Sequence, residues 1–140
     1  MDGDWHFTMT DIPMIDTPSP NFDERNLPVS MLVLHYTGMP DAASAIHWLA
    51  SPESKVSAHY VVTEDGQVIR MVDEAKRAWH AGRSHWRGID DINSASIGIE
   101  IVNPGHEWGY RPDALHLLLG PGCRCGTRSL RRRTCRLAST

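Results

Sequence analysis

The sequence predicts a layered fold of the mixed α/β or α+β class, in which strands and helices pack around one core. Three observations support this class. An unbroken apolar run at residues 31–35 is followed by a helical pattern at residues 42–50. An Asp-Gly turn signal at residues 65–66 separates two short apolar segments. Alternation of isoleucines with smaller or polar residues marks a further strand at residues 96–102.

The first third of the chain predicts an extended segment, a strand and a helix. Residues 10–28 contain four prolines among Asp, Ser, Thr and Asn, which predicts an extended lead-in rather than packed structure. The run at residues 31–35 lacks alternation, so we expect a strand buried on both faces. Asp41 can cap the helix at residues 42–50. The side chains on its apolar face are Ala42, Ala45, Ile46 and Leu49.

A hairpin and a long loop follow. Residues 58–63 and 68–72 are strand candidates, and the Asp-Gly pair between them supplies the positive φ that a tight turn requires. Residues 73–95 predict a loop with one helical turn. The strand at residues 96–102 should place its three isoleucines on one face. Residues 114–119 begin a helical pattern that the sequence Gly-Pro-Gly ends.

Acidic residues, arginines and cysteines are distributed unevenly along the 140 residues of the chain. The net charge is −3, yet all 17 acidic residues lie before residue 120, whereas residues 120–140 carry six arginines and all three cysteines. Such a tail can bind nucleic acid or a membrane surface. Because this tail lacks lysine and periodicity, we interpret it as the translation of a coding sequence in a shifted reading frame rather than as a functional basic tail. The residues concerned are Cys123, Arg124, Cys125, Arg128, Arg131, Arg132, Arg133, Cys135 and Arg136.

The composition sets expectations for partners and location. No apolar run approaches the roughly 20 residues of a membrane-spanning helix, so we expect no membrane partner. The acidic N-terminus has no basic segment followed by an apolar one, which predicts a cytoplasmic protein without a secretory signal. We also expect no nucleic-acid partner and a monomer.

Two residues stand out as candidates for chemistry. His35 ends the first predicted strand, where open α/β sheets place ligands, and a neutral imidazole there is a plausible zinc ligand. The alternative is a histidine that only bonds the following loop. Glu100 lies between isoleucines on the strand face of Ser96 and Gly98, where partial burial would raise its pKa and suit a general base or acid. The alternative is a solvent-facing glutamate on an edge strand. His59 is expected to be a satisfied core histidine.

Four segments, in this order and spacing, resemble the type-2 N-acetylmuramoyl-L-alanine amidases, the family that also includes peptidoglycan recognition proteins and phage-type amidases. The resemblance covers the chain from about residue 19 to residue 112. Any one segment alone would be a weak signal, whereas the ordered set is specific. The segments are Val33-Leu34-His35-Tyr36-Thr37, Val56-Ser57-Ala58-His59-Tyr60-Val61-Val62, Ala78-Trp79-His80-Ala81-Gly82 and Ser96-Ile97-Gly98-Ile99-Glu100.

The resemblance implies a central mixed β-sheet flanked by helices, with one Zn²⁺ in a groove. By position it implies that His35 is a zinc ligand and Glu100 the catalytic glutamate. Trp79, His80 and Asn93 fall in segments that line the substrate groove. The implied reaction is hydrolysis of the amide between N-acetylmuramic acid and L-alanine, with peptidoglycan fragments (muropeptides) as partners.

The family needs two further zinc ligands, a His and an Asp or Cys, which follow a long C-terminal helix. The sequence departs from this pattern after Pro112, so we expect that helix and the metal loop to be missing. The predicted organisation is an extended lead-in at 1–18, a partial amidase domain at 19–119 and an aberrant tail at 120–140. Three functions remain open: a chain made inactive by the lost ligands, an active amidase with substitute ligands, and a non-catalytic peptidoglycan-binding module.

Overall fold

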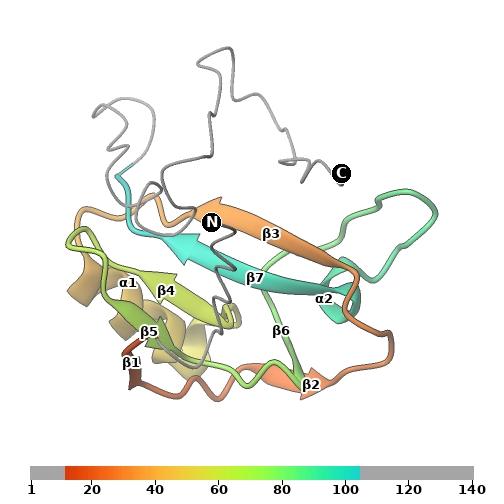
Figure 1. Ribbon diagram of the computed structural model, residues 1–140, viewed down its shortest axis with the longest axis horizontal. Coiled ribbons are helices and arrows are strands. Elements are labelled where there is room, and N and C mark those ends of the chain that lie inside the picture. The colour runs from red at the N-terminus through yellow and green to blue at the C-terminus, as the bar shows by residue number, and fades with distance from the viewer. Residues whose placement is uncertain (1–11, 105–140) are drawn as a thin grey trace, which may run out of the picture.

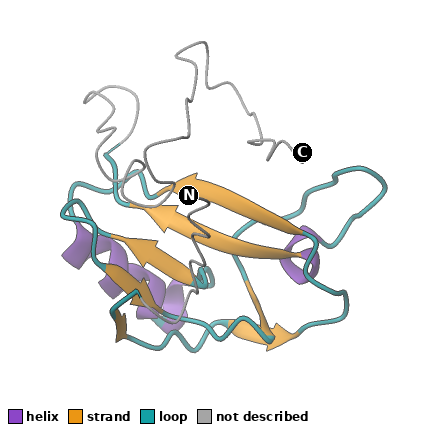
Figure 2. Cartoon of the chain, viewed as in Figure 1, coloured by secondary structure: helices purple, strands orange, loops and turns teal. Residues whose placement is uncertain are grey.

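The computed structural model describes residues 12–104, which form two sheets and two α-helices (Figures 1 and 2). The larger sheet is mixed and has the strand order β1-β5-β4-β7-β3, in which only β4 and β5 are antiparallel. The central mixed sheet implied by the family resemblance is therefore confirmed. Its strands are β1 (Met14–Asp16), β3 (Met31–Tyr36), β4 (Tyr60–Val62), β5 (Val68–Arg70) and β7 (Ser96–Ile101).

Helix α1 (Ala42–Ala50) covers one face of this sheet (Figure 2). The Asp41 side chain caps it by accepting a hydrogen bond of 2.8 Å from the Ser44 amide, as the sequence predicts. A short 3-10 turn, η2 (Pro52–Ser54), follows the helix. The predicted apolar face is confirmed, because Ala45 and Leu49 are buried in the core and Ala42 and Ile46 pack against it. The other buried members of this core are Val61, Ile69, Met71 and Val102.

The predicted hairpin is present, with shorter strands than expected. Gly66 has a φ of 85° in the turn between β4 and β5, which a residue with a Cβ rarely adopts. At the other end, the amides of Met71 and Val72 both donate to the carbonyl oxygen of His59, at 2.9 and 3.4 Å. Two residues facing one is the pattern of a β-bulge, and it ends the regular pairing.

The expectation that the strand at residues 31–35 is buried on both faces is wrong. Strand β3 is the last in the strand order and pairs only with β7 among the described strands. Leu32 and Tyr36 are 54% and 53% exposed. An apolar run predicts a strand, but the position of that strand in the sheet decides how much of it is buried.

We expected residues 10–28 to be an extended segment without packed structure. In the described part, residues 12–28, two strands instead join sheets. Strand β1 joins the large sheet, and β2 (Phe22–Glu24) pairs with β6 (Lys76–Ala78) in a second sheet. Ser19 is buried and donates a hydrogen bond of 2.6 Å to the carbonyl oxygen of Leu49. The backbone is extended as predicted, yet buried polar side chains attach it to the domain.

The loop expected at residues 73–95 contains strand β6 and, as predicted, one helical turn, α2 (Ile92–Ala95). Alternation could not reveal β6, because its sequence is Lys-Arg-Ala. Opposite charges attach it to β2 instead, since Arg77 and Lys76 lie directly across from Asp23 and Glu24 and form ion pairs with them.

The expected helix at residues 114–119, the tail at 120–140 and the break after Pro112 lie outside the described residues. The predicted domain boundary at residue 119 also lies outside the described residues, and the boundary at residue 18 stays a prediction. Within residues 12–104, neither helix has the length or the apolar composition to cross a membrane.

Candidate functional site

The candidate site lies where β3 and β7 approach their C-terminal ends. The two strands are parallel, and the register places His35 directly opposite Glu100. Residues opposite each other in adjacent strands share a face, so both side chains point to the same side of the sheet. Val61 of β4 lies opposite Glu100 and packs against α1. The site is therefore on the face that α1 covers in part.

Glu100 is a carboxylate in an apolar setting. Its Oε2 atom is buried and has no hydrogen-bond partner among the described residues. Burial raises the pKa of Glu100 to about 7. A carboxyl group with this pKa can take up and release a proton near neutral pH, which is what a general base or acid requires. The alternative of a solvent-facing glutamate therefore does not describe Glu100.

His80 joins the site from the segment that follows β6. Its Nδ1 lies 3.0 Å from Nε2 of His35, and its Nε2 lies 3.1 Å from Oγ of Ser96. Burial lowers the pKa of His80 to about 3 and holds the pKa of His35 below its ordinary value. Both imidazoles are therefore neutral at neutral pH, the form in which a histidine can bind a metal. His35 thus contacts His80 rather than serving only the following loop.

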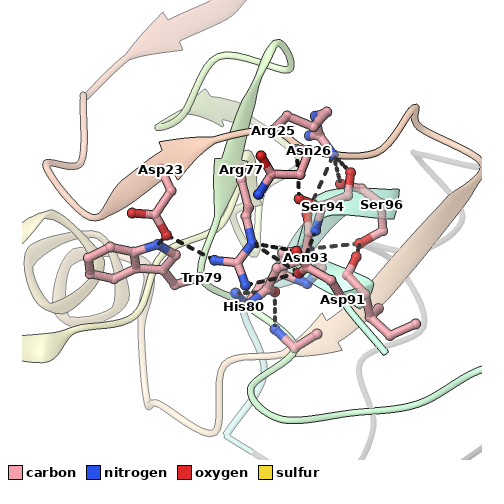
Figure 3. Close-up of polar contacts among 12 residues, drawn as sticks. Asp23, Arg25, Asn26, Arg77, Trp79, His80, Asp91, Asn93, Ser94 and Ser96 are labelled. Atoms are coloured by element: carbon pink, nitrogen blue, oxygen red, sulfur yellow. Dashed lines mark hydrogen bonds and ion pairs between the residues drawn. The ribbon is translucent and has the colours of Figure 1, made fainter. Parts of the chain in front are cut away.

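Asn93 and Trp79 use their polar side-chain atoms within the protein (Figure 3). Asn93 is buried, and its Oδ1 accepts hydrogen bonds from the amides of His80 and Ala81 at 3.0 and 2.7 Å. The indole Nε1 of Trp79 donates to Asp23 at 2.7 Å. Asn93 therefore fixes the backbone that carries His80. A direct contact of Trp79, His80 or Asn93 with substrate stays a prediction.

His59 is structural, in agreement with the sequence. It is fully buried, and its Nδ1 accepts a hydrogen bond of 2.9 Å from the amide of Gly98. The proton must then be on Nε2, which lies 3.0 Å from the carbonyl oxygen of Lys76. Burial lowers its pKa and so favours this neutral form.

Arg25 is a supporting residue that the sequence did not reveal. Its guanidinium donates to the carbonyl oxygens of Lys76 at 2.7 Å and Ser96 at 3.0 Å, and also to that of Ser94 (Figure 3). It therefore connects the β2 segment to β6 and to the start of β7. Arg25 lies outside the four motif segments, and most of its partners are backbone atoms, so no sequence pattern marks it. Its Nη2 atom also lies 3.0 Å from Nε2 of His59.

The described residues fit part of a zinc site. They offer a neutral imidazole, His35, beside a buried carboxylate oxygen of Glu100 that lacks a partner. Within residues 12–104, however, no group of three His, Cys, Asp or Glu side chains could hold a metal. A catalytic zinc normally takes three protein ligands, so the remaining ligands would have to come from outside these residues.

Comparison with known proteins gives one family. The family model for N-acetylmuramoyl-L-alanine amidase (Amidase_2) matches residues 25–126, most of the chain and beyond the expected break after Pro112. A similar protein is the 1,6-anhydro-N-acetylmuramyl-L-alanine amidase AmpD of Haemophilus influenzae, which is 31% identical over an alignment of 102 residues that covers 59% of this chain and 55% of that protein.

Two solved structures have a similar fold. A crystal structure of AmpD aligns with a TM-score of 0.57 at 31% identity and covers 64% of this chain and 61% of that one. The structure of AMPDH3 from Pseudomonas aeruginosa in complex with an anhydromuramic pentapeptide aligns with a TM-score of 0.56 at 29% identity, and covers 84% of this chain and 48% of that one. The chain thus spans less than two thirds of each of these relatives. It belongs to the N-acetylmuramoyl-L-alanine amidase family.

Proposed function

We propose that this chain hydrolyses the amide bond between N-acetylmuramic acid and L-alanine in peptidoglycan fragments. Glu100 is the general base and acid, and His35 is a metal ligand. The observation that carries the proposal is the buried Oε2 of Glu100, which has no partner in residues 12–104 and lies across from His35 on the adjacent strand. Membership of the amidase family supplies the reaction.

The chemistry of Glu100 suits this role. With its pKa raised to about 7, Glu100 is ionised in a large fraction of the molecules at neutral pH. The ionised carboxylate is also basic enough to accept a proton at that pH. It can therefore take a proton from the attacking water and give it to the leaving amine of L-alanine. A glutamate in water, with a pKa near 4.3, would be a weaker base for the same step.

We propose Zn²⁺ as the cofactor, because the family uses it and His35 is a neutral imidazole at the right edge of the sheet. Zinc in such a site makes water more acidic and polarises the carbonyl group. His35 would contribute one ligand, and the others would come from outside residues 12–104. The expectation that the sequence after Pro112 has lost them remains a prediction, as does the cytoplasmic location.

The proposed substrates are muropeptides, including those with an anhydro sugar. This choice is supported by the similar AMPDH3 structure, which holds an anhydromuramic pentapeptide. Trp79, His80 and Asn93 are proposed to border the groove. Trp79 is only partly buried and offers an aromatic face, whereas Asn93 would act through the loop that its side chain holds.

A second candidate function is binding of peptidoglycan fragments without turnover. Residues 12–104 contain no group of three metal-binding side chains, so this candidate applies if the residues outside that range supply no further ligands. A chain that kept the groove and lost the metal would bind its ligand and leave the amide intact. The two candidates agree on the ligand and differ in whether the bond is broken.

The test combines zinc analysis with product detection. The purified full chain is assayed for bound zinc, then incubated with an anhydromuropeptide with added zinc or with EDTA, and products are separated by mass. Hydrolysis predicts a free L-alanine peptide that EDTA and Glu100→Gln both abolish, while Glu53→Gln, an exposed control, leaves it unchanged. Ligand binding without product in zinc-supplemented buffer would contradict hydrolysis and support the second candidate.

A further inference from the structure

A line of four polar groups connects α2 to the metal-ligand candidate on β3. It starts at the carbonyl oxygen of Ile92 and continues through Oγ of Ser96, which donates to that oxygen. His80 follows, with Nε2 at 3.1 Å from the Ser96 Oγ. Nδ1 of His80 then lies 3.0 Å from Nε2 of His35. No other described residue forms a hydrogen bond with the His35 side chain.

The direction of each hydrogen bond follows from the proton count. The Ser96 hydroxyl has a single proton, and the carbonyl oxygen of Ile92 can only accept it. Ser96 must then accept from His80, so the proton of the neutral His80 ring is on Nε2. Nδ1 of His80 therefore has a lone pair and accepts from Nε2–H of His35. Nδ1 of His35 is left without a proton.

We propose that His80 is a positioning residue that holds His35 as the Nε2–H tautomer and keeps the Nδ1 lone pair free for a metal ion. A ligand histidine usually donates its other ring N–H to a partner that fixes its tautomer and ring orientation. Here the partner is a second histidine, which is itself fixed by Ser96. The metal part of the inference rests on the proposed function, whereas the tautomer does not.

Gly98 provides the space for this arrangement. A Cβ at Gly98 would lie 2.3 Å from Cγ, 2.4 Å from Cδ2 and 2.6 Å from Nδ1 of His80. The φ of Gly98 is not in the left-handed region, so the backbone alone does not require glycine there. The requirement is steric, because the His80 ring lies directly on the strand backbone. Alanine at this position would push His80 away from His35.

This role differs from the substrate contact that the family resemblance implied for His80. Both ring nitrogens of His80 are engaged within the protein, one with His35 and one with Ser96. A direct hydrogen bond from substrate to His80 would have to displace one of these partners. Through His35, the imidazole acts on the metal site without a hydrogen bond to the substrate.

The tautomer can be measured directly in the metal-free full chain. Long-range ¹H–¹⁵N spectra of ¹⁵N-histidine-labelled protein at pH 8 identify which ring nitrogen of each histidine carries the proton. We expect Nε2–H for both His35 and His80. In His80→Ala and in Gly98→Ala, His35 should show a mixture of tautomers. A proton on Nδ1 of His35 in the unsubstituted chain would overturn the inference.

Zinc affinity supplies the second readout, by competition with a chelator of known affinity. His80→Ala should weaken zinc binding about 10- to 100-fold. In His80→Asn, the amide oxygen occupies nearly the place of Nδ1 and can accept from His35, so most of the affinity should return. His47→Ala, at an exposed position in the last turn of α1, is the control. Equal affinities of His80→Ala and the unsubstituted chain would refute the metal part.

Two outcomes separate this inference from the proposed function. If the chain binds no zinc, the tautomer spectra still decide whether His80 fixes His35, and only the proposed function is contradicted. If His80→Ala fails to fold, Ser96→Ala takes its place, since it removes the acceptor of His80 and keeps both histidines. A uniform Nε2–H tautomer of His35 in Ser96→Ala would contradict the proton count given above.

Discussion

Replacing Glu100 by glutamine should change how the stability of the fold depends on pH. The folded chain raises the pKa of this carboxyl group from 4.5 to about 7, because its Oε2 atom is buried without a partner. The folded state therefore binds the proton more tightly than the unfolded state, and the free energy of unfolding falls as pH rises through this window. At about 1.36 kcal/mol per pKa unit, the loss between pH 4.5 and pH 7 amounts to about 3 kcal/mol.

Glutamine has nearly the same shape and does not titrate, so Glu100→Gln should remove this part of the slope. The assay is urea unfolding of the EDTA-treated chain at several pH values between 5 and 8. We expect the variant to gain stability over the unsubstituted chain as pH rises, by up to about 3 kcal/mol at pH 8. Glu53→Gln is the matched control, because Glu53 is exposed and its pKa is lowered by the Ser51 hydroxyl, which puts its titration below this window. Parallel curves for Glu100→Gln and the unsubstituted chain would refute the reasoning.

Two further predictions concern the support of the site. Arg25→Ala should lower the free energy of unfolding by about 2 kcal/mol, since it leaves several backbone carbonyls without their donor, whereas Arg70→Ala on the exposed pair with Asp16 should change it little. Chemical denaturation measures both, and equal effects would contradict the role of Arg25. Asn93→Ala should cost about 1–3 kcal/mol because two amides of the His80 loop lose their acceptor, and Asn93→Asp should recover part of this loss. Faster hydrogen exchange at the amide of His80 in the alanine variant is the expected local sign, and unchanged exchange would argue against it.

Elements with local signals could be predicted from the sequence. Helix α1 has its cap, Asp41, directly before its apolar face, and its bounds agree with the prediction. The β4–β5 turn depends on Gly66, whose φ of 85° is a conformation that favours glycine. The requirement concerns this single residue and so is visible in the local sequence. In such cases neighbours along the chain determine the structure, so a pattern in the sequence is enough.

Elements held by distant partners could not be predicted. Strand β6 pairs with β2, about 50 residues earlier, and its charged side chains lie opposite those of β2. Neither segment alternates like a strand. The exposed face of β3 follows from its place in the strand order, which an apolar run does not encode. The packing of residues 12–28 depends on single polar side chains such as Ser19, whose partner is 30 residues away.

The residues of the candidate site likewise fall into those that the sequence indicates and those that only the structure shows. His35 and Glu100 could be proposed separately, because a histidine at a strand end and a carboxylate between isoleucines each stand out. Their register and the position of His80 required the structure, since His80 is 45 residues from His35 in the chain. Gly98 lies in the motif of Glu100, yet only the His80 ring above it explains why a side chain is excluded there.

Cleavage of a defined muropeptide by the zinc-supplemented full chain tests the central claim most directly. The substrate is an N-acetylmuramic acid peptide with a single lactyl–L-alanine amide, and the products are identified by mass. We predict release of the intact peptide with a free L-alanine amino group, and loss of that product in Glu100→Gln. Turnover by Glu100→Gln at the rate of the unsubstituted chain, or no product from the unsubstituted chain while it binds the substrate, would contradict it.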